Sequence, residues 1–347
     1  MIFDRMTLSR KAKELGFNRS EYEKVCRLVD VLRYFESDPL LSSVLALKGG
    51  TALNLTVFDV PRLSVDIDLD FTENVSKEEM IERRKIITTR IVKYMQANGY
   101  ALSDKSKSPH ALDSFVFNYR NAVEMNDNIK IEINYMNRCH ILPCERRTVA
   151  AGFADEAVTV LCVNPIEIYG SKITALINRS TPRDLFDVKN ISERATIKNG
   201  DRDILRKIVA FYTALSAENV SENPDFSNIE SITQLSIKKE LLPVLKENYF
   251  DAAEAKSACI TFLNGILDFT ADEKAFLSEF AGGNFLPDLL FGDSEEYARI
   301  KNHPMAVFKC RNNSQKPFVL AKLEENKKKI QENDTNKKSP ARNNHER

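Results

Sequence analysis

A glycine turn followed closely by a strand of alternating aspartates constrains the fold of this chain more than any other feature. The segment Lys48–Leu53 reads Lys-Gly-Gly-Thr-Ala-Leu, and the segment Ser64–Asp70 reads Ser-Val-Asp-Ile-Asp-Leu-Asp. The first is typical of a strand that runs into a glycine turn and a helix start. The second places carboxylates at every other position of an otherwise apolar strand. Together they indicate backbone amides for a polyphosphate and a carboxylate pair for its magnesium ions.

The aspartates of this strand share one face, because successive side chains of a strand point to opposite sides. Three like charges on a buried strand repel one another unless a cation lies among them. Magnesium held by carboxylates and substrate phosphates is the usual solution in phosphoryl-transfer sites. We expect Asp66 and Asp68 to form the metal-binding pair and Asp70, near the strand end, to meet solvent. The alternative is an edge strand with one wet face, although such strands more often carry lysine and mixed charges.

The glycine turn adds a second, independent element. A helix that begins just after Gly49 and Gly50 presents unpaired amides and the positive end of its dipole, which suits phosphate oxygens. We expect the hydroxyl of Thr51 to contact the same phosphates. The chain has no GxxxxGK[ST] sequence, which excludes a Walker-type loop.

A third carboxylate is available at Glu132. Alternation in the segment Lys130–Asn134 places Lys130, Glu132 and Asn134 on one face and isoleucines on the other. If this strand neighbours the aspartate strand, Glu132 completes a two-metal site. The alternative is an ordinary half-exposed strand.

The pattern of the whole chain predicts two domains and a tail. A length of 347 residues with 43% hydrophobic content suffices for two packed cores. Residues 1–163 read as an α/β domain, and residues 164–323 read almost entirely as helices, including one expected over 235–248. Residues 324–347 are rich in lysine and asparagine, and we expect them to be disordered.

Composition restricts the setting of the protein. Fifty basic residues balance 50 acidic ones, so bulk charge does not indicate a nucleic-acid binder, although a local basic surface remains open. The six cysteines are scattered without a CxxC pair, and we expect reduced thiols in a cytoplasmic protein. The sequence contains no run of about 18 apolar residues, so it predicts no membrane-spanning helix. The helix expected over 76–98 carries five basic residues: Arg83, Arg84, Lys85, Arg90 and Lys93. We interpret them as a solvated helix face. The alternative is that they line a groove for RNA.

A second polar cluster begins just after the α/β domain. Lys172 and Arg179 lie seven residues apart in an expected helix and therefore share one face. Thr181 and Asp184 fit a helix N-cap and its capping-box acid, and Arg183 could form a surface pair with Asp187. This is also where a phosphate-binding lysine and an orienting aspartate would be expected.

These motifs, taken together, resemble the AbiEii/AbiGii nucleotidyltransferase toxins, which include the abortive-infection toxin AbiE and the mycobacterial MenT toxins. The resemblance runs from about Leu45 to Ile191 and rests on the glycine turn, the aspartate strand, and Lys172 followed by Pro182–Asp187. It implies an N-terminal nucleotidyltransferase domain of the DNA-polymerase-β type, with a mixed sheet, followed by an all-α C-terminal domain.

The resemblance also implies a function and a set of site residues. The family's toxins transfer a nucleotide from an NTP, in characterised relatives onto the 3′ end of tRNA, and inhibit growth or phage propagation. A separately encoded antitoxin opposes them, without the need for a stable complex. By motif match, Asp66 and Asp68 hold two magnesium ions, Lys172 and Asp187 are the further catalytic residues, and the nucleotide contacts come from Gly49, Gly50, Thr51, Lys172 and Arg183. Glu132 as a metal ligand follows only from strand alternation.

Two other functions stay open at this point. One is nucleotide transfer to a small molecule or to a protein hydroxyl. The other is a degenerate enzyme that acts by binding RNA or a partner, against which the intact Asp66 and Asp68 argue. An antitoxin is disfavoured, because the sequence shows no basic N-terminal segment that would read DNA.

Overall fold

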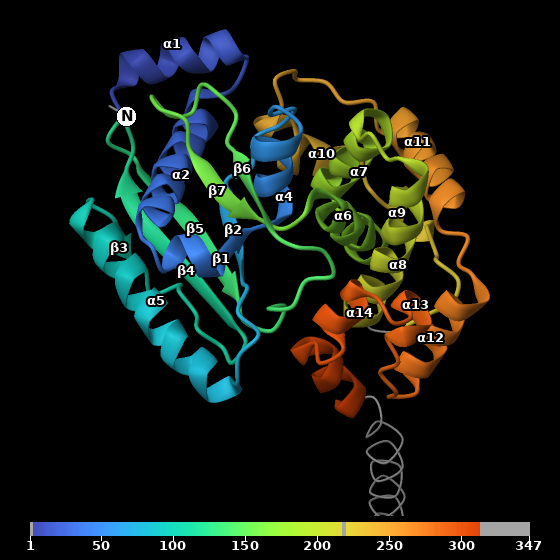
Figure 1. Cartoon of the computed structure of the whole chain (residues 1–347). Coiled ribbons are helices and arrows are strands. Elements are labelled where there is room, and N and C mark those ends of the chain that lie inside the picture. Colours follow the sequence, from blue (N-terminus) through green and yellow to red (C-terminus); the bar gives the residue numbers. More distant parts are fainter. Residues whose placement is uncertain (1–2, 217–219, 313–347) are drawn as a thin grey trace, which may run out of the picture.

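A mixed sheet forms the centre of the N-terminal half in the computed structural model, which describes residues 3–216 and 220–312 (Figure 1). Within these residues the sheet has seven strands in the order β3-β4-β5-β2-β1-β7-β6. Pairs β2/β5 and β1/β7 are parallel, and the other neighbours are antiparallel. The strands are β1 (Leu45–Leu47), β2 (Asp66–Phe71), β3 (Ala101–Leu102), β4 (Leu112–Arg120), β5 (Asn126–Asn134), β6 (Glu145–Thr148) and β7 (Thr159–Cys162).

Alternation of apolar and polar residues explains the two sides of this sheet. In β2, Ile67 and Leu69 are buried in the core, and the aspartates between them point the other way. The isoleucines of β5 are buried on the same side as Ile67, in register with it. One face of the sheet is therefore apolar, and the other carries charge.

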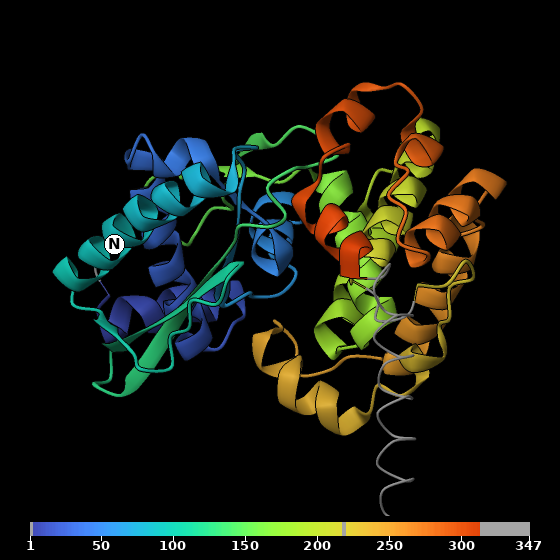
Figure 2. The same ribbon diagram turned by 90° about the horizontal axis from the view of Figure 1, so that it is seen from below.

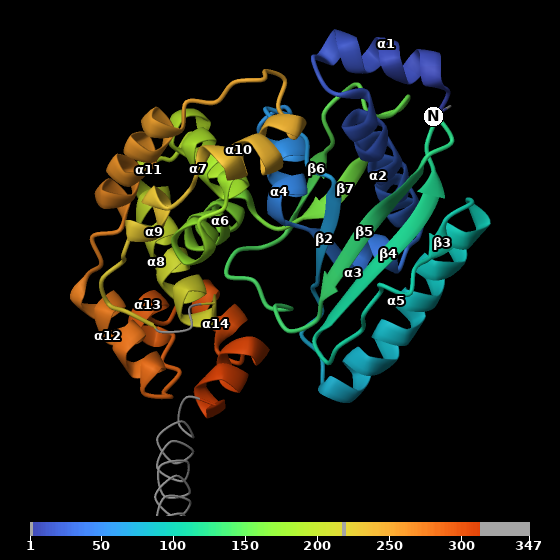
Figure 3. The same cartoon turned by 180° about the vertical axis from the view of Figure 1, so that it is seen from behind.

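Helices cover the apolar face. The helix α2 (Arg19–Ser37) contacts β5 and β7, and α5 (Lys77–Ala97) runs beside β3 (Figures 2 and 3). The two helices meet through Tyr34 and Tyr94, whose stacked rings lie 3.7 Å apart. The expected capping box of α5 is present between Ser76 and Glu79.

The other helices of the N-terminal half are short or peripheral. Helix α4 begins at Gly49 and continues directly into the π-helical turn η1, so the helix after the glycine turn starts two residues before Thr51. These elements are α1 (Arg5–Leu15), α3 (Leu41–Val44), α4 (Gly49–Ala52) and η1 (Leu53–Val57).

The described residues from Pro165 to 312 are helical and contain no named strand, as the sequence predicts. Helix α6 packs against both α7 and α8 in the middle of this half (Figure 1). Its helices are α6 (Pro165–Arg179), α7 (Pro182–Arg194), α8 (Asn199–Ser216), α9 (Ser227–Glu230), α10 (Gln234–Glu240), η2 (Leu242–Val244), α11 (Ala252–Ile266), α12 (Ala271–Ala281), α13 (Asp288–Phe291) and α14 (Glu295–Ile300).

One helix is shorter than the sequence predicts. The helix expected over 235–248 ends at Glu240 and is followed by the three-residue turn η2. Pro243 explains the break, because proline disfavours a helical conformation in the residue before it and lacks a backbone donor. The domain boundary after residue 163 stays a prediction, and the tail over 324–347 lies outside the described residues.

Two further expectations can be compared with the structure. None of the six cysteines forms a disulfide. In the described ranges no helix combines the length and the apolar character that crossing a bilayer requires.

The basic face of α5 is largely engaged within the protein. Arg84 forms an ion pair of 2.6 Å with Asp113 of β4, and Arg90 forms one of 2.7 Å with Asp38. Arg83 and Lys85 also have acidic partners. These pairs attach the helix to its surroundings, and both interpretations of the face stay predictions.

Candidate active site

Strand register places the predicted carboxylates side by side. In the parallel pair β2/β5, Asp66 lies opposite Lys130 and Asp68 lies opposite Glu132. The aspartate strand and the Glu132 strand are therefore neighbours, as the interpretation of Glu132 requires. On the other side of β2, the backbone amide of Lys48 donates to the carbonyl of Asp68 at 2.9 Å, which fixes the glycine turn next to the same residue.

Asp68 lies at the centre of this charged face. Burial, followed by the nearby charges of Asp66 and Glu132, raises the pKa of Asp68, while Lys48 and Lys172 counteract that rise. Glu132 also accepts an ion pair of 3.0 Å from Lys130. The accumulated negative charge around Asp68 favours binding of a cation.

The first glycine of the turn lets the backbone approach Asp68. Gly49 has a φ of +66°, and a Cβ built on it would lie 2.8 Å from Asp68 Oδ2. Both the left-handed backbone and the close carboxylate exclude a larger side chain. The requirement for glycine at this position thus comes from the carboxylate strand itself.

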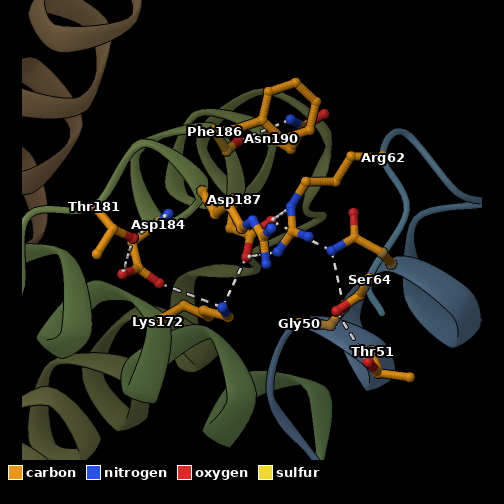
Figure 4. A network of polar contacts seen from close by, with 12 residues as sticks. Gly50, Thr51, Arg62, Ser64, Lys172, Thr181, Asp184, Phe186, Asp187 and Asn190 are labelled. Carbon is orange, nitrogen blue, oxygen red and sulfur yellow. Dashed lines mark hydrogen bonds and ion pairs between the residues drawn. The ribbon is translucent and has the colours of Figure 1, made fainter. Parts of the chain in front are cut away.

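The second glycine lies among cationic side chains. A Cβ built on Gly50 would lie 2.7 Å from Arg62 Nη2, 3.0 Å from Ser64 Oγ and 3.6 Å from Lys172 Nζ. The backbone of the turn therefore faces two positive groups of the structure (Figure 4). Such an arrangement suits an anion that lies against the start of α4.

Thr51 has a different place from the one expected. Its hydroxyl donates to the backbone carbonyl of Asp66 and lies 2.9 Å from Ser64 Oγ. The side chain is fully buried, so it secures α4 against β2. A direct contact of this hydroxyl with phosphate has no support in its position.

Lys172 and Arg179 of α6, whose spacing predicts a shared face, both contact Asp184. Lys172 Nζ lies 3.4 Å from Asp184 Oδ1, and Arg179 donates to both carboxylate oxygens of Asp184 at 2.7 and 2.9 Å. Against the effect of burial, Lys172 and Arg179 lower the pKa of Asp184. Thr181 caps α7 at the same residue, so Asp184 has a capping role as well as an ionic one.

Asp187 is the buried centre of the second cluster (Figure 4). It accepts hydrogen bonds from Arg62 Nε at 2.8 Å and Nη2 at 2.7 Å, and Lys172 Nζ lies 2.8 Å from its Oδ2. Although burial opposes it, Arg62 and then Lys172 lower the pKa of Asp187 to about 2. The expected surface pair of Asp187 with Arg183 is wrong.

Arg183 points away from this cluster. It donates to the carbonyl of Glu240 at 2.9 Å instead. Asp184 and Asp187 lie three residues apart and face α6 together, and this leaves Arg183 on another side of α7. Its expected contact with the nucleotide has no support in this position.

The expectation that Asp70 meets solvent is wrong. Asp70 is 3% exposed, accepts an ion pair from Lys48 Nζ and lies 3.2 Å from His140 Nε2. Against the effect of burial, Lys48 and then His140 lower the pKa of Asp70. Its partners come from a turn and a loop distant in sequence, which strand alternation alone does not reveal.

A cleft of about 440 Å³ is lined by some of these groups, whereas Asp66, Glu132 and Asp187 are not among its lining residues. Its wall on the sheet side includes Lys48, Gly49, Gly50 and Asp68, and its opposite wall includes Lys172 and Arg179 of α6. The cleft thus lies between the N-terminal half and the helices after Pro165. Carboxylates (Asp68, Asp70 and Glu167) and cations (Lys48, Lys172 and Arg179) from separate elements line the same space.

The donor set of this face fits magnesium. Carboxylate oxygens are the ligands that Mg²⁺ takes from protein, usually one or two of them with substrate phosphates and water completing the shell. In the described part of the chain, no group of three or more His, Cys, Asp and Glu side chains is arranged to hold a metal unaided. Asp66, Asp68 and Glu132 therefore do not form such a group by themselves, and their role as magnesium ligands stays a prediction.

Sequence reasoning missed Arg62 and His140 as parts of this region. The side chain of Arg62 is only 2% exposed. Because Arg62 lies in an irregular segment, no helical or strand periodicity of the sequence predicts this burial. The only local hint is its position two residues before Ser64 and four before Asp66, next to the aspartate strand. His140 comes from the loop after β5 and offers no motif.

Comparison with known protein families assigns the chain to one of them. A family model described as the nucleotidyl transferase AbiEii toxin of type IV toxin–antitoxin systems matches residues 30–274. The chain therefore belongs to the AbiEii nucleotidyltransferase toxin family. No curated protein matches the sequence.

A solved structure shares the fold. MenT4, a nucleotidyltransferase toxin from Mycobacterium tuberculosis H37Rv, superposes with a TM-score of 0.58 at 16% identity. The match covers 86% of this chain and 98% of that one. The mixed sheet with its helices is thus a nucleotidyltransferase toxin fold.

Proposed function

We propose that this protein transfers a nucleotide from an NTP to the 3′ end of tRNA and thereby inhibits growth or phage propagation. The observation that carries the proposal is the cleft in which Asp68 and the Gly49–Gly50 turn face Lys172. Family membership supports nucleotide transfer as the reaction, and the resemblance described above supports tRNA as the acceptor.

The reaction joins an acceptor hydroxyl to the α-phosphorus of the NTP. A new O–P bond forms as the bond between the α-phosphorus and its bridging oxygen breaks, and the hydroxyl proton leaves to a base or to water. Pyrophosphate departs with the electron pair of the broken bond. Catalysis of such a transfer consists mainly of positioning and charge stabilisation.

The residues of the cleft fit these two tasks. The amides at the start of α4, next to Gly49 and Gly50, hold phosphate oxygens. Lys172 neutralises charge on the phosphates, and Asp187 keeps its ammonium group in place at 2.8 Å. Arg62 fixes Asp187 in turn, so the phosphate-binding lysine is held through a buried chain of ion pairs.

Asp66 and Asp68 would hold the magnesium ions, with Glu132 as a further carboxylate. Magnesium bound there would supply polarisation of the phosphate and would favour ionisation of the attacking hydroxyl. The raised pKa of Asp68, caused by burial and then by the charges of Asp66 and Glu132, supports this proposal, because a cation would relieve their repulsion.

In this proposal, the helices after Pro165 form a second domain, which provides the wall of the cleft opposite the sheet. A cognate antitoxin opposes the toxin in the cytoplasm without a stable complex. Transfer to a small molecule or a protein hydroxyl is the alternative reaction, and it differs only in the acceptor.

The test is transfer of label from NTPs to total bacterial RNA. The protein is incubated in Mg²⁺ with each of the four NTPs, labelled in parallel at the α- or the γ-phosphate. We expect α-label, and no γ-label, to appear at the 3′ end of tRNA. Label on a small molecule or protein alone would replace the proposed acceptor, and no α-label transfer from any NTP would contradict the proposed reaction.

A further inference from the structure

The third aspartate of the strand, Asp70, also lines the cleft, but the reaction proposed above assigns it no role. It lies on the same face of β2 as Asp68 but deeper, with 3% of its surface exposed. A carboxylate buried this far requires partners, because an unpaired charge in the interior is costly. Its partners show what it does.

Lys48 is one of those partners and lines the cleft. Its backbone is opposite Asp68 in the antiparallel pair of β1 and β2, so its side chain lies diagonally across from Asp70 on the same face. The ammonium group pairs with Asp70 Oδ1, yet 27% of the side chain is still exposed. A lysine ammonium has three donors, and Asp70 does not exhaust them.

His140 is the second partner. Its Nε2 lies 3.2 Å from Asp70 Oδ2, the oxygen that Lys48 does not use. Burial acts against it, but the hydrogen bond to Asp70 raises the pKa of His140 well above its ordinary value. Asp70 therefore shares its charge between two cations, and Lys48 retains attraction for an anion in the cleft.

The loop that carries His140 is fixed by the helical half. Glu167 of α6 accepts hydrogen bonds from the backbone amides of Ile141 at 3.1 Å and Leu142 at 2.9 Å. Tyr212 of α8 donates to the same carboxylate at 2.6 Å. The position of Lys48 thus depends on contacts from both halves of the protein.

We propose that Lys48 is a second phosphate-binding cation of the cleft, held in place by Asp70 and His140 as positioning residues. Lys48 lies on the sheet side and Lys172 on the α6 side of the same cleft, with the glycine turn between them. A polyphosphate on the turn then meets a lysine from each wall. The inference rests on the proposed nucleotide site and adds a residue to it.

The experiment measures binding of inorganic tripolyphosphate and of the four NTPs in Mg²⁺ by calorimetry, with the full chain. We expect Lys48→Met to raise the Kd for tripolyphosphate and for the bound NTP by about tenfold or more, since it removes a charged hydrogen bond. Lys13→Met, at an exposed position of α1, is the matched control and should leave both Kd values unchanged. Equal binding by Lys48→Met and the wild type would overturn the assignment.

A double-mutant cycle separates positioning by Asp70 from a general structural role. We expect Asp70→Asn to raise the Kd for tripolyphosphate about twofold or more in the wild-type background. It should have no further effect on that Kd in the Lys48→Met background. The same loss in both backgrounds would overturn the positioning role. The double variant leaves no unpaired charge between these two positions, so it also reports on Lys48 if a single variant unfolds.

The result for the wild type distinguishes the two proposals. Wild-type protein that binds NTP and tripolyphosphate, with no effect of Lys48→Met, contradicts only this inference. Wild-type protein that binds neither ligand contradicts the nucleotide site itself, and the inference with it.

Discussion

Arg62 and Asp187 form a doubly hydrogen-bonded ion pair that joins the strand-rich half of the protein to the helical half. The two bonds measure 2.8 and 2.7 Å, and the side chains are 2% and 1% exposed. Burial of two charges costs much of what their attraction provides, so such a pair adds little stability by itself. Its consequence is positional, because it fixes α7 and Lys172 relative to the glycine turn.

Replacement of Asp187 should destabilise the protein by much more than the small net stability that the Arg62–Asp187 pair contributes. Asp187→Asn leaves the guanidinium of Arg62 buried without its charge partner and deprives Lys172 of its nearest carboxylate. We expect the free energy of unfolding to fall by about 3–5 kcal/mol. Urea denaturation measures it, with Asp104→Asn at an exposed position as the control. A loss as small as that of the control would show that the pair is not held as described.

The same acid should give the protein a characteristic sensitivity to low pH. The pKa of Asp187 is lowered from 3.8 to about 2, so its folded state binds a proton less readily than the unfolded state. The lowered pKa of Asp187 therefore adds about 2 kcal/mol to the free energy of unfolding above pH 3.8, and this contribution is lost as the pH falls toward 2. Unfolding measured from pH 5 to 2 should show this slope in the wild type. An unchanged slope in Asp187→Asn would contradict the assignment of the slope to this residue.

Gly50 should not tolerate even one added methyl group. The new Cβ would lie 2.7 Å from Arg62 Nη2, and Arg62 cannot move without breaking its bonds to Asp187. We expect Gly50→Ala to lower stability by about 1–3 kcal/mol and to abolish nucleotide transfer. Gly265→Ala is the matched control, because its Cβ meets nothing within 4 Å and alanine favours the helix. Normal activity in Gly50→Ala would refute the tight approach of turn and cation.

Glu132 offers a test of the third metal ligand. If it contributes to magnesium binding, Glu132→Gln should raise the Mg²⁺ concentration needed for half-maximal transfer by about tenfold. Titration of Mg²⁺ in the transfer assay measures this, with exposed Glu156→Gln as the control. The same Mg²⁺ dependence in both variants would leave Glu132 as the partner of Lys130 alone.

The sequence allowed prediction of those elements whose cause is local. Alternation identified β2 and β5, and the capping box identified the start of α5, because period and capping act within a few residues. The spacing of Lys172 and Arg179 likewise predicted a shared face, and both side chains contact Asp184. Local patterns therefore sufficed for these elements and for the shared face of α6.

The misinterpreted residues depend on partners far away in the chain. Asp70 was expected in solvent, but it is buried by Lys48, 22 residues earlier, and His140, 70 residues later. Arg62 was missed because its partner Asp187 lies 125 residues away. No periodicity carries such pairings, which arise only when the sheet and the helices pack together.

Transfer of label by wild-type protein and by Asp68→Asn tests the central claim most directly. Asparagine keeps the size of the side chain and removes the charge at the centre of the carboxylate face. With α-labelled NTPs, total bacterial RNA and Mg²⁺, we predict label at RNA 3′ ends for the wild type and for Asp104→Asn. We predict none for a folded Asp68→Asn. Undiminished transfer by Asp68→Asn would contradict the assignment of this cleft as the nucleotidyltransferase site.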